Sequence, residues 1–248
     1  MQRWLVLAGV VFALSGCDTL FPEFSGKPAD ASIPGDGGAS DGGGSPMLAG
    51  VVCILGDVRD YRTCATGAPG SLRITVEETR EQTMTDVTGH FTLPLSTKLD
   101  LATVAAIDPS GNYAPSIVPL RLLNGVANNV ALPVVSQQTL MQLELANGVQ
   151  DDPQLGTFLG WAVDPSGTPV AGVSTGNTRA FYDDNAPNSL SAGTSTHQRG
   201  TIAFFTVTPT SLMLTLTPPP TGPLSSDTFT VPIRSGAVTA TTLVLPPR

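Results

Sequence analysis

The sequence predicts an all-β protein that is built from two tandem seven-stranded β-sandwiches. Three observations lead to this prediction. Short apolar segments, several of them alternating apolar and polar residues, are separated by turn residues at the spacing typical of sandwiches. The 26 Gly and 22 Pro favour turns over helices. The pattern of residues 47–135 also recurs in residues 157–248.

The first sixteen residues have the composition of an export signal. Residues 1–3 carry one positive charge, and residues 4–14 are apolar but too few to span a bilayer. The stretch Leu14-Ser15-Gly16-Cys17 resembles the lipobox of bacterial lipoproteins. That resemblance implies a signal peptide at 1–16, a lipid on Cys17 and an anchor in the bacterial cell envelope, facing either the periplasm or the cell surface. The alternative is an ordinary secretory signal followed by a free thiol.

Residues 17–46 are rich in Gly, Ser, Asp and Pro. Such a segment cannot bury enough apolar surface to offset its ordering entropy. We therefore expect a disordered tether behind the lipidated cysteine, with a root-mean-square span of about 30 Å.

The first predicted sandwich occupies residues 47–135. Residues 71–77 alternate apolar and polar in the manner of a half-buried strand, and Asp and Gly within 85–91 mark a tight turn. The further strand segments are expected at 48–55, 91–95, 101–107, 116–122 and 129–135. A linker at 136–156 follows, in which Ser136 and Gly148 are placed to bound a short helix.

The second predicted sandwich, residues 157–248, repeats the first. Gly160 to Val163 stand 110 positions after Gly50 to Cys53, and Gly200 stands 111 after Gly89. The ends of the two segments match at an offset of 113. Several matches in one order indicate that a whole domain was duplicated.

Short motifs in both halves resemble carboxypeptidase regulatory-like domains. They are a Thr-Asp-x-x-Gly-x-Phe turn at 85–91, a Pro-Val-Ala-Gly-Val step at 169–173 and an opening Gly-x-Val strand. The first half lacks the Pro-Val step, and the second lacks the Asp of the turn. The resemblance implies a transthyretin-like, immunoglobulin-like β-sandwich and a non-catalytic accessory module of exported and envelope proteins.

Cys53 and Cys64 form an even pair in an exported protein, so a disulfide is expected. A two-cysteine metal site is the alternative, but neither of the two histidines has zinc-ligand spacing to them. We predict no metal and no cofactor.

The formal net charge of −8 disfavours nucleic acid as a partner, because phosphate binding needs a basic surface. Contact with the membrane is expected through the N-terminal lipid alone. No nucleophile motif, phosphate loop or dinucleotide fingerprint is present, so we predict that the protein is not an enzyme.

Residues 181–188 of the second half are predicted to form an unusually long loop. Tyr182, Asp183, Asp184 and Asn185 are its candidate binding residues. The oxygens of Asp183, Asp184 and Asn185 would suit calcium, although a plain surface turn is the simpler interpretation. We expect a binding or structural protein whose partner is an envelope protein or a glycan. The alternatives are an envelope hydrolase with an unrecognised site and a carbohydrate-binding adhesin module.

Overall fold

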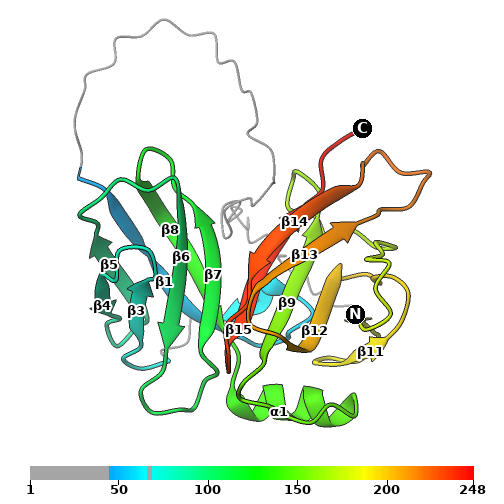
Figure 1. Cartoon of the computed structure of the whole chain (residues 1–248), viewed down its shortest axis with the longest axis horizontal. Helices are drawn as coiled ribbons and strands as arrows, with labels where there is room; N and C mark the ends of the chain where they lie inside the picture. Colours follow the sequence, from blue (N-terminus) through cyan, green and yellow to red (C-terminus); the bar gives the residue numbers. More distant parts are fainter. Residues whose placement is uncertain (1–44, 66–68) are drawn as a thin grey trace, which may run out of the picture.

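The computed structural model describes residues 45–65 and 69–248, and it confirms the all-β prediction (Figure 1). The predicted signal peptide, Cys17 and nearly all of the predicted tether lie outside the described residues. Within the described part of the chain, no helix is long and apolar enough to cross a membrane.

The first half, residues 47–135, holds two packed sheets. One sheet contains β1 with β2 and β5 as antiparallel neighbours and β8 as a parallel neighbour, and the other has the order β4-β3-β6-β7. Alternation places Phe91 and Leu93 of β5 in the core and their neighbours in solvent. The strands are β1 (Met47–Leu55), β2 (Cys64–Ala65), β3 (Arg73–Val76), β4 (Gln82–Met84), β5 (His90–Pro94), β6 (Leu101–Ile107), β7 (Ser116–Arg121) and β8 (Val126–Val134).

The second half, residues 157–248, repeats this plan with seven strands. β12, β9 and β15 correspond to β5, β1 and β8, and the hairpin β13–β14 corresponds to β6–β7. Its strands are β9 (Gly156–Val163), β10 (Phe181–Asp183), β11 (Leu190–Ala192), β12 (Thr201–Val207), β13 (Ser211–Leu216), β14 (Asp227–Pro232) and β15 (Val238–Val244).

Equivalent hydrogen bonds recur at equivalent places in the two halves. Thr85 Oγ1 accepts the Leu72 N–H at 3.0 Å, and Thr196 Oγ1 accepts the Val173 N–H at the same distance. The first pair of residues is 13 positions apart and the second pair is 23 apart. The ten additional residues of the second half contribute to the hairpin β10–β11, which pairs with β12 and widens that sheet.

The two halves share one sheet. β15 pairs with β9 on one edge, and on the other it pairs in parallel with β7, matching Val238 to Ser116 and Thr239 to Ile117. The sheet therefore runs through nine strands in the order β11-β10-β12-β9-β15-β7-β6-β3-β4. Figure 1 shows β7 and β15 meeting near the lower end of the molecule and diverging above it.

Helix α1 (Gln137–Ala146) lies between the halves in the chain. Ser136 Oγ accepts the Thr139 N–H at 3.0 Å, which is an N-cap, and Gly148 adopts a φ of +67° just past the end. The helix packs against a third hydrophobic core at the junction of the two halves, in which Leu143 contacts residues of both halves. Separate cores fill the two sandwiches.

Candidate binding site at the junction of the two halves

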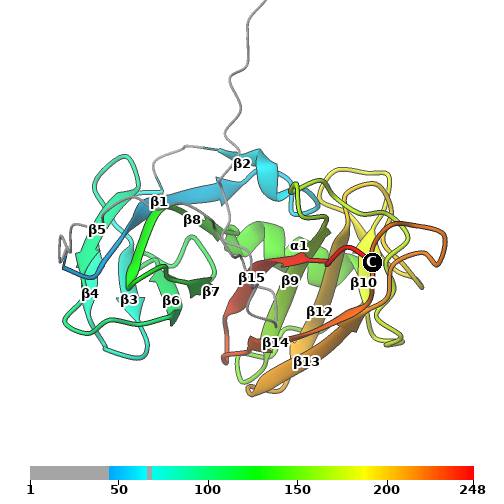
Figure 2. The same ribbon diagram turned by 90° about the horizontal axis from the view of Figure 1, so that it is seen from above.

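Residues 56–63, which connect β1 to β2, form a docking arm that reaches from the first half onto the second. The predicted disulfide between Cys53 and Cys64 is present at its base, with 5.2 Å between the two Cα atoms. Figure 2 shows this segment, in cyan, extending from β1 toward the second half. The disulfide restricts the arm to a short closed loop, so less entropy is lost when the arm docks.

The apolar side of the docking arm is buried against β9. Val58 is completely buried, and the Trp161 indole Nε1 donates to the Val58 carbonyl oxygen at 3.1 Å. The rings of Tyr61 and Trp161 have their centroids 5.9 Å apart, and the Tyr61 hydroxyl donates to the Gly167 carbonyl oxygen at 2.6 Å. Trp161 is completely buried, and the core to which it belongs is this junction.

The polar side of the arm carries a largely buried ion pair between Arg59 and Asp57. Arg59 donates from Nε and Nη2 to the two carboxylate oxygens of Asp57, at 3.0 and 2.6 Å. Burial alone would raise the pKa of Asp57, but hydrogen bonds from Arg59 and Asn188 outweigh burial and lower that pKa. The ion pair stays charged and orients Arg59 Nη1 toward the Asp184 carbonyl oxygen, 2.8 Å away.

Asn188 binds the arm from the second half. Its side-chain oxygen accepts the Val58 N–H at 2.9 Å, and its Nδ2 donates to the Gly56 carbonyl oxygen at 3.1 Å. Its own N–H donates to Asp57 Oδ1 at 3.1 Å. One asparagine thus satisfies three polar groups of the arm.

Asp60 is the second acidic residue of the arm. It accepts hydrogen bonds from Arg62, with Nε at 2.9 Å, and from Nη1 of Arg199 in the second half. Burial opposes ionisation of Asp60, but its bonds to Arg62 and the charges of Arg62 and Arg199 lower its pKa. A further ion pair between the halves joins Glu77 to Arg234, with 2.5 Å between Oε2 and Nη2.

The interpretation of residues 181–188 as one long loop is wrong for Tyr182 and Asp183. Both belong to strand β10, where Tyr182 is 2% exposed and Asp183 is 1% exposed. The extra residues of the second half extend a sheet, and the connecting turn begins at Asp184. Three residues are too few for an alternating pattern to distinguish such a strand from a loop.

Asp183 shapes the segment that follows the turn. Its carboxylate accepts the backbone N–H groups of His197, Arg199 and Thr201 at 3.0, 2.8 and 3.0 Å. Three donors satisfy a carboxylate that burial would otherwise make costly. Asp183 is therefore a structural residue that holds the backbone of residues 197–199 in place.

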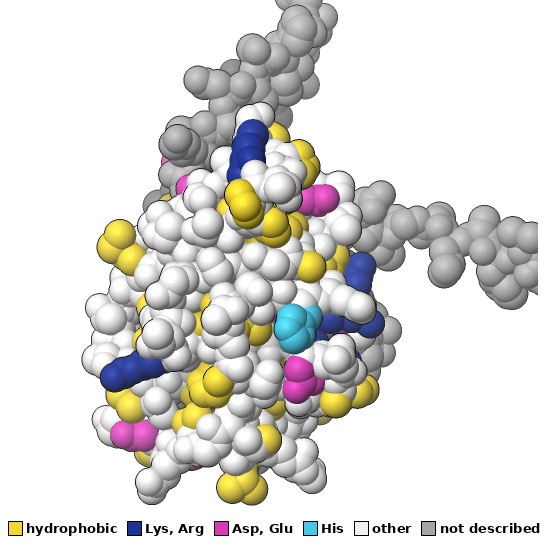
Figure 3. All heavy atoms as spheres, turned by 90° about the vertical axis from the view of Figure 1, so that its right-hand side faces the viewer, with side chains coloured by type: hydrophobic (Ala, Val, Ile, Leu, Met, Phe, Trp, Pro, Cys, Tyr) yellow, Lys and Arg dark blue, Asp and Glu magenta, His cyan; other side chains and the backbone are white. Residues whose placement is uncertain are grey.

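Asp184 and Asn185 do line a pocket. It has a volume of about 110 Å³ and is completed by Arg59 of the docking arm and by residues 197–199. Figure 3 shows a histidine next to acidic and basic side chains on a face that otherwise carries few charges. A hydrogen bond from the Ala186 N–H, with help from the Ser189 hydroxyl, lowers the pKa of Asp184 and keeps it ionised.

The pocket offers both signs of charge within a small volume, which suits a polar group that donates and accepts hydrogen bonds. Within residues 45–65 and 69–248, no group of three or more Asp, Glu, His or Cys side chains is arranged to hold a metal ion.

Sequence reasoning did not find Asp57, Arg59, Asp60 or Asn188. The Asp-x-Arg spacing at 57–59 and again at 60–62 was the available signal.

Comparison with known protein families finds no match, and comparison with curated proteins finds none either. Solved structures give distant likenesses. The Bacillus anthracis TIE protein is 12% identical with a TM-score of 0.27, and the match covers 82% of this chain and 34% of that one. GBS52, the minor pilin in the gram-positive pathogen Streptococcus agalactiae, is 12% identical with a TM-score of 0.27, over 82% of this chain and 97% of that one.

A putative cell adhesion protein from Bacteroides ovatus is 8% identical with a TM-score of 0.22, over 81% of this chain and 92% of that one. The chain thus spans about a third of the length of the TIE protein.

Proposed function

We propose that this protein is a lipid-anchored lipoprotein of the bacterial cell envelope, whose two β-sandwiches act as one non-catalytic binding or structural unit. The observation that carries the proposal is that the docking arm packs on the second half. The two halves are thereby joined by a common buried core as well as by a shared sheet. A rigid sandwich supplies stable loops for recognition. Cys17 and residues 17–46 supply the anchor and the spacer.

We further infer that both halves are carboxypeptidase regulatory-like, transthyretin-like domains. The support lies in the turn motif at 85–91 and in its counterpart at 196–200. Thr85 and Thr196 make the same bonds there, each donating its hydroxyl hydrogen to a backbone carbonyl oxygen as well as accepting an N–H.

The anchor is tested by metabolic labelling with a tagged fatty acid in the native host. The wild-type protein should be labelled and should sediment with membranes, and Cys17→Ala should lose the label. The double variant Cys53→Ala/Cys64→Ala is the control, because it removes two cysteines and should keep the lipid. Labelling of Cys17→Ala would contradict the lipobox assignment.

The partner in this proposal is an envelope protein or a glycan held at the pocket that Asp184 and Asn185 line. Asn185→Ala with Gln198→Ala should weaken capture of cross-linked partners from the native envelope. Asn128→Ala, which changes an exposed amide on β8 of the first half, should leave capture unchanged. Equal capture by all three proteins would remove the pocket from the proposal, and labelling by a serine-directed probe would favour a hydrolase instead.

A further inference from the structure

A second pocket lies beside α1, apart from the junction pocket. It has a volume of about 130 Å³, small against the ~300–1,000 Å³ of sites for small molecules. Its walls come from the helix, from the chain between the helix and β9, from β12 and from the turn before β15. The residues around it include Leu140, Glu144, Asp151, Asp152, Leu155 and Thr206.

Glu144 is a buried acidic side chain that lines this pocket without a hydrogen-bond partner. It is only 6% exposed, and no hydrogen bond or ion pair of its carboxylate is found among the described residues. Every fully buried side-chain nitrogen or oxygen in the described part of the chain has a partner. The Glu144 carboxylate therefore keeps its remaining accessibility through the pocket that it lines.

The surroundings of Glu144 are acidic. Burial first, and the charge of Asp151 second, raise the pKa of Glu144. Asp152 lies on the same wall, and the C-terminal end of α1 adds the negative end of the helix dipole. No Lys or Arg occurs between residues 122 and 178. Arg234, two residues before the pocket residue Gly236, is held by Glu77.

The rest of the pocket is shaped for an aliphatic chain. Leu140, Pro153 and Leu155 give it apolar walls. Met141 and Leu145 follow the pocket residues Leu140 and Glu144 on the neighbouring row of the helix, and they are 63% and 77% exposed. In Figure 3, hydrophobic side chains protrude at the lower edge of the molecule, the level at which Figure 1 places α1.

Strand β12 contributes a fixed wall. Its pairing with β9 shifts register between Phe204 and Val207, and Thr206 takes a φ of +52° there. A β-branched residue in this region of φ is strained and persists only where its surroundings impose it. The bulge removes Thr206 from the ladder and leaves it lining the pocket.

We propose that this pocket binds the ammonium group of a lysine side chain on a partner polypeptide, with an apolar neighbour of that lysine covering Met141 and Leu145. The compact ammonium matches the small volume and the unpartnered carboxylate, and the apolar walls match its methylene stem. The proposal goes beyond the binding role proposed above, because this pocket shares no lining residue with the junction pocket. The net charge of −8 favours a basic partner.

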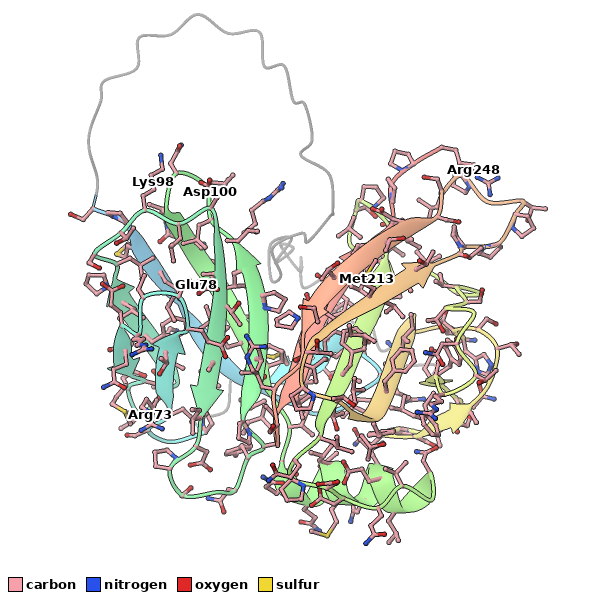
Figure 4. All side chains as sticks on the ribbon, in the orientation of Figure 1. Arg73, Glu78, Lys98, Asp100, Met213 and Arg248 are labelled. Carbon is pink, nitrogen blue, oxygen red and sulfur yellow. A yellow bond between two sulfur atoms is a disulfide. The ribbon has the colours of Figure 1, made fainter. Side chains whose placement is uncertain are left out.

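The probe is a capped leucyl-lysyl-leucine tripeptide, titrated into the full mature chain in detergent and followed by calorimetry. The matched control peptide has norleucine in place of lysine. We expect saturable binding of the lysine peptide, at least tenfold weaker binding of the norleucine peptide, and at least tenfold weaker binding of the lysine peptide to Glu144→Gln. Asp100→Asn should bind like the wild type, because Figure 4 places Asp100 at the opposite end of the first half from α1.

Asp151→Asn provides a second variant that leaves Glu144 in place, and it should weaken the lysine peptide several-fold. Equal binding of both peptides, or wild-type binding by both Glu144→Gln and Asp151→Asn, would overturn the proposal. Calcium chloride is titrated alone as a further probe. If calcium binds to the wild type but not to Glu144→Gln, and the lysine peptide does not bind at all, the pocket is a site for an inorganic cation and the proposal is overturned as well. Fatty-acid labelling of Glu144→Gln should be normal, so failure of this pocket is distinguishable from failure of the anchor.

Discussion

The indole Nε1 of Trp161 donates a hydrogen bond of 3.1 Å to the carbonyl oxygen of Val58. The two residues lie 103 positions apart, one in β9 and the other in the docking arm, and both are completely buried. The bond joins the first strand of the second half to a loop of the first half. Both residues belong to a core to which both halves contribute, so we expect the stability of each half to depend on the other.

Replacing Trp161 by Phe should lower the free energy of unfolding by about 1–3 kcal/mol. The change removes the indole donor and leaves the buried Val58 carbonyl oxygen unpaired. Denaturant unfolding followed by circular dichroism measures it. The control is Val87→Ala, where the side chain is 77% exposed, and it should change stability by less than about 0.5 kcal/mol. A similar small change in Trp161→Phe would show that the bond does not stabilise the junction.

The double variant Cys53→Ala/Cys64→Ala should lose about 3 kcal/mol of stability, because the disulfide closes a short loop. The docking arm should also become a site of tryptic cleavage after Arg62, whose side chain is 47% exposed and held only by Asp60 within the arm. Mass spectrometry of timed digests tests this. An arm that resists trypsin in the variant as it does in the wild type would mean that the second half alone fixes its conformation.

Asp183→Ala should destabilise the second half by about 3 kcal/mol or more, since three backbone N–H groups lose their acceptor. The matched change Asp227→Ala removes an acidic side chain from β14 that accepts only the N–H of the next residue. Thermal unfolding of the two variants should therefore differ by several degrees. Equal midpoints would contradict the structural role of Asp183.

Glu144 makes stability depend on pH. Its pKa is raised in the folded state, so between the ordinary pKa of glutamate and this raised value the folded protein binds more protons than the unfolded chain. The free energy of unfolding should fall as pH rises through that window. Glu144→Gln should remove this fall and be more stable than the wild type at pH 8, with little difference at pH 4. Parallel pH profiles of the two proteins would contradict the burial of an unpaired carboxylate.

Sequence reasoning predicted the fold because its signals are local. Alternation at 71–77, the turn at 85–91 and the capped helix after Ser136 each depend on neighbouring residues. The Cys53–Cys64 disulfide was predicted from the expected oxidising compartment and from the even pair of cysteines, and it is present. Sequence reasoning missed the docking arm, because Val58 and Trp161 are 103 positions apart and only the tertiary fold brings them together. Tyr182 and Asp183 were misplaced for the same reason, since a three-residue strand is defined by its partner β12 and not by its own pattern.

Differential scanning calorimetry of the full chain tests the central claim, that the docking arm and the shared sheet make the two halves one cooperative unit. We predict a single transition with equal calorimetric and van't Hoff enthalpies. Reduction of the Cys53–Cys64 disulfide should lower its midpoint. Two separated transitions in the oxidised protein, or a calorimetric enthalpy about twice the van't Hoff value, would contradict the account.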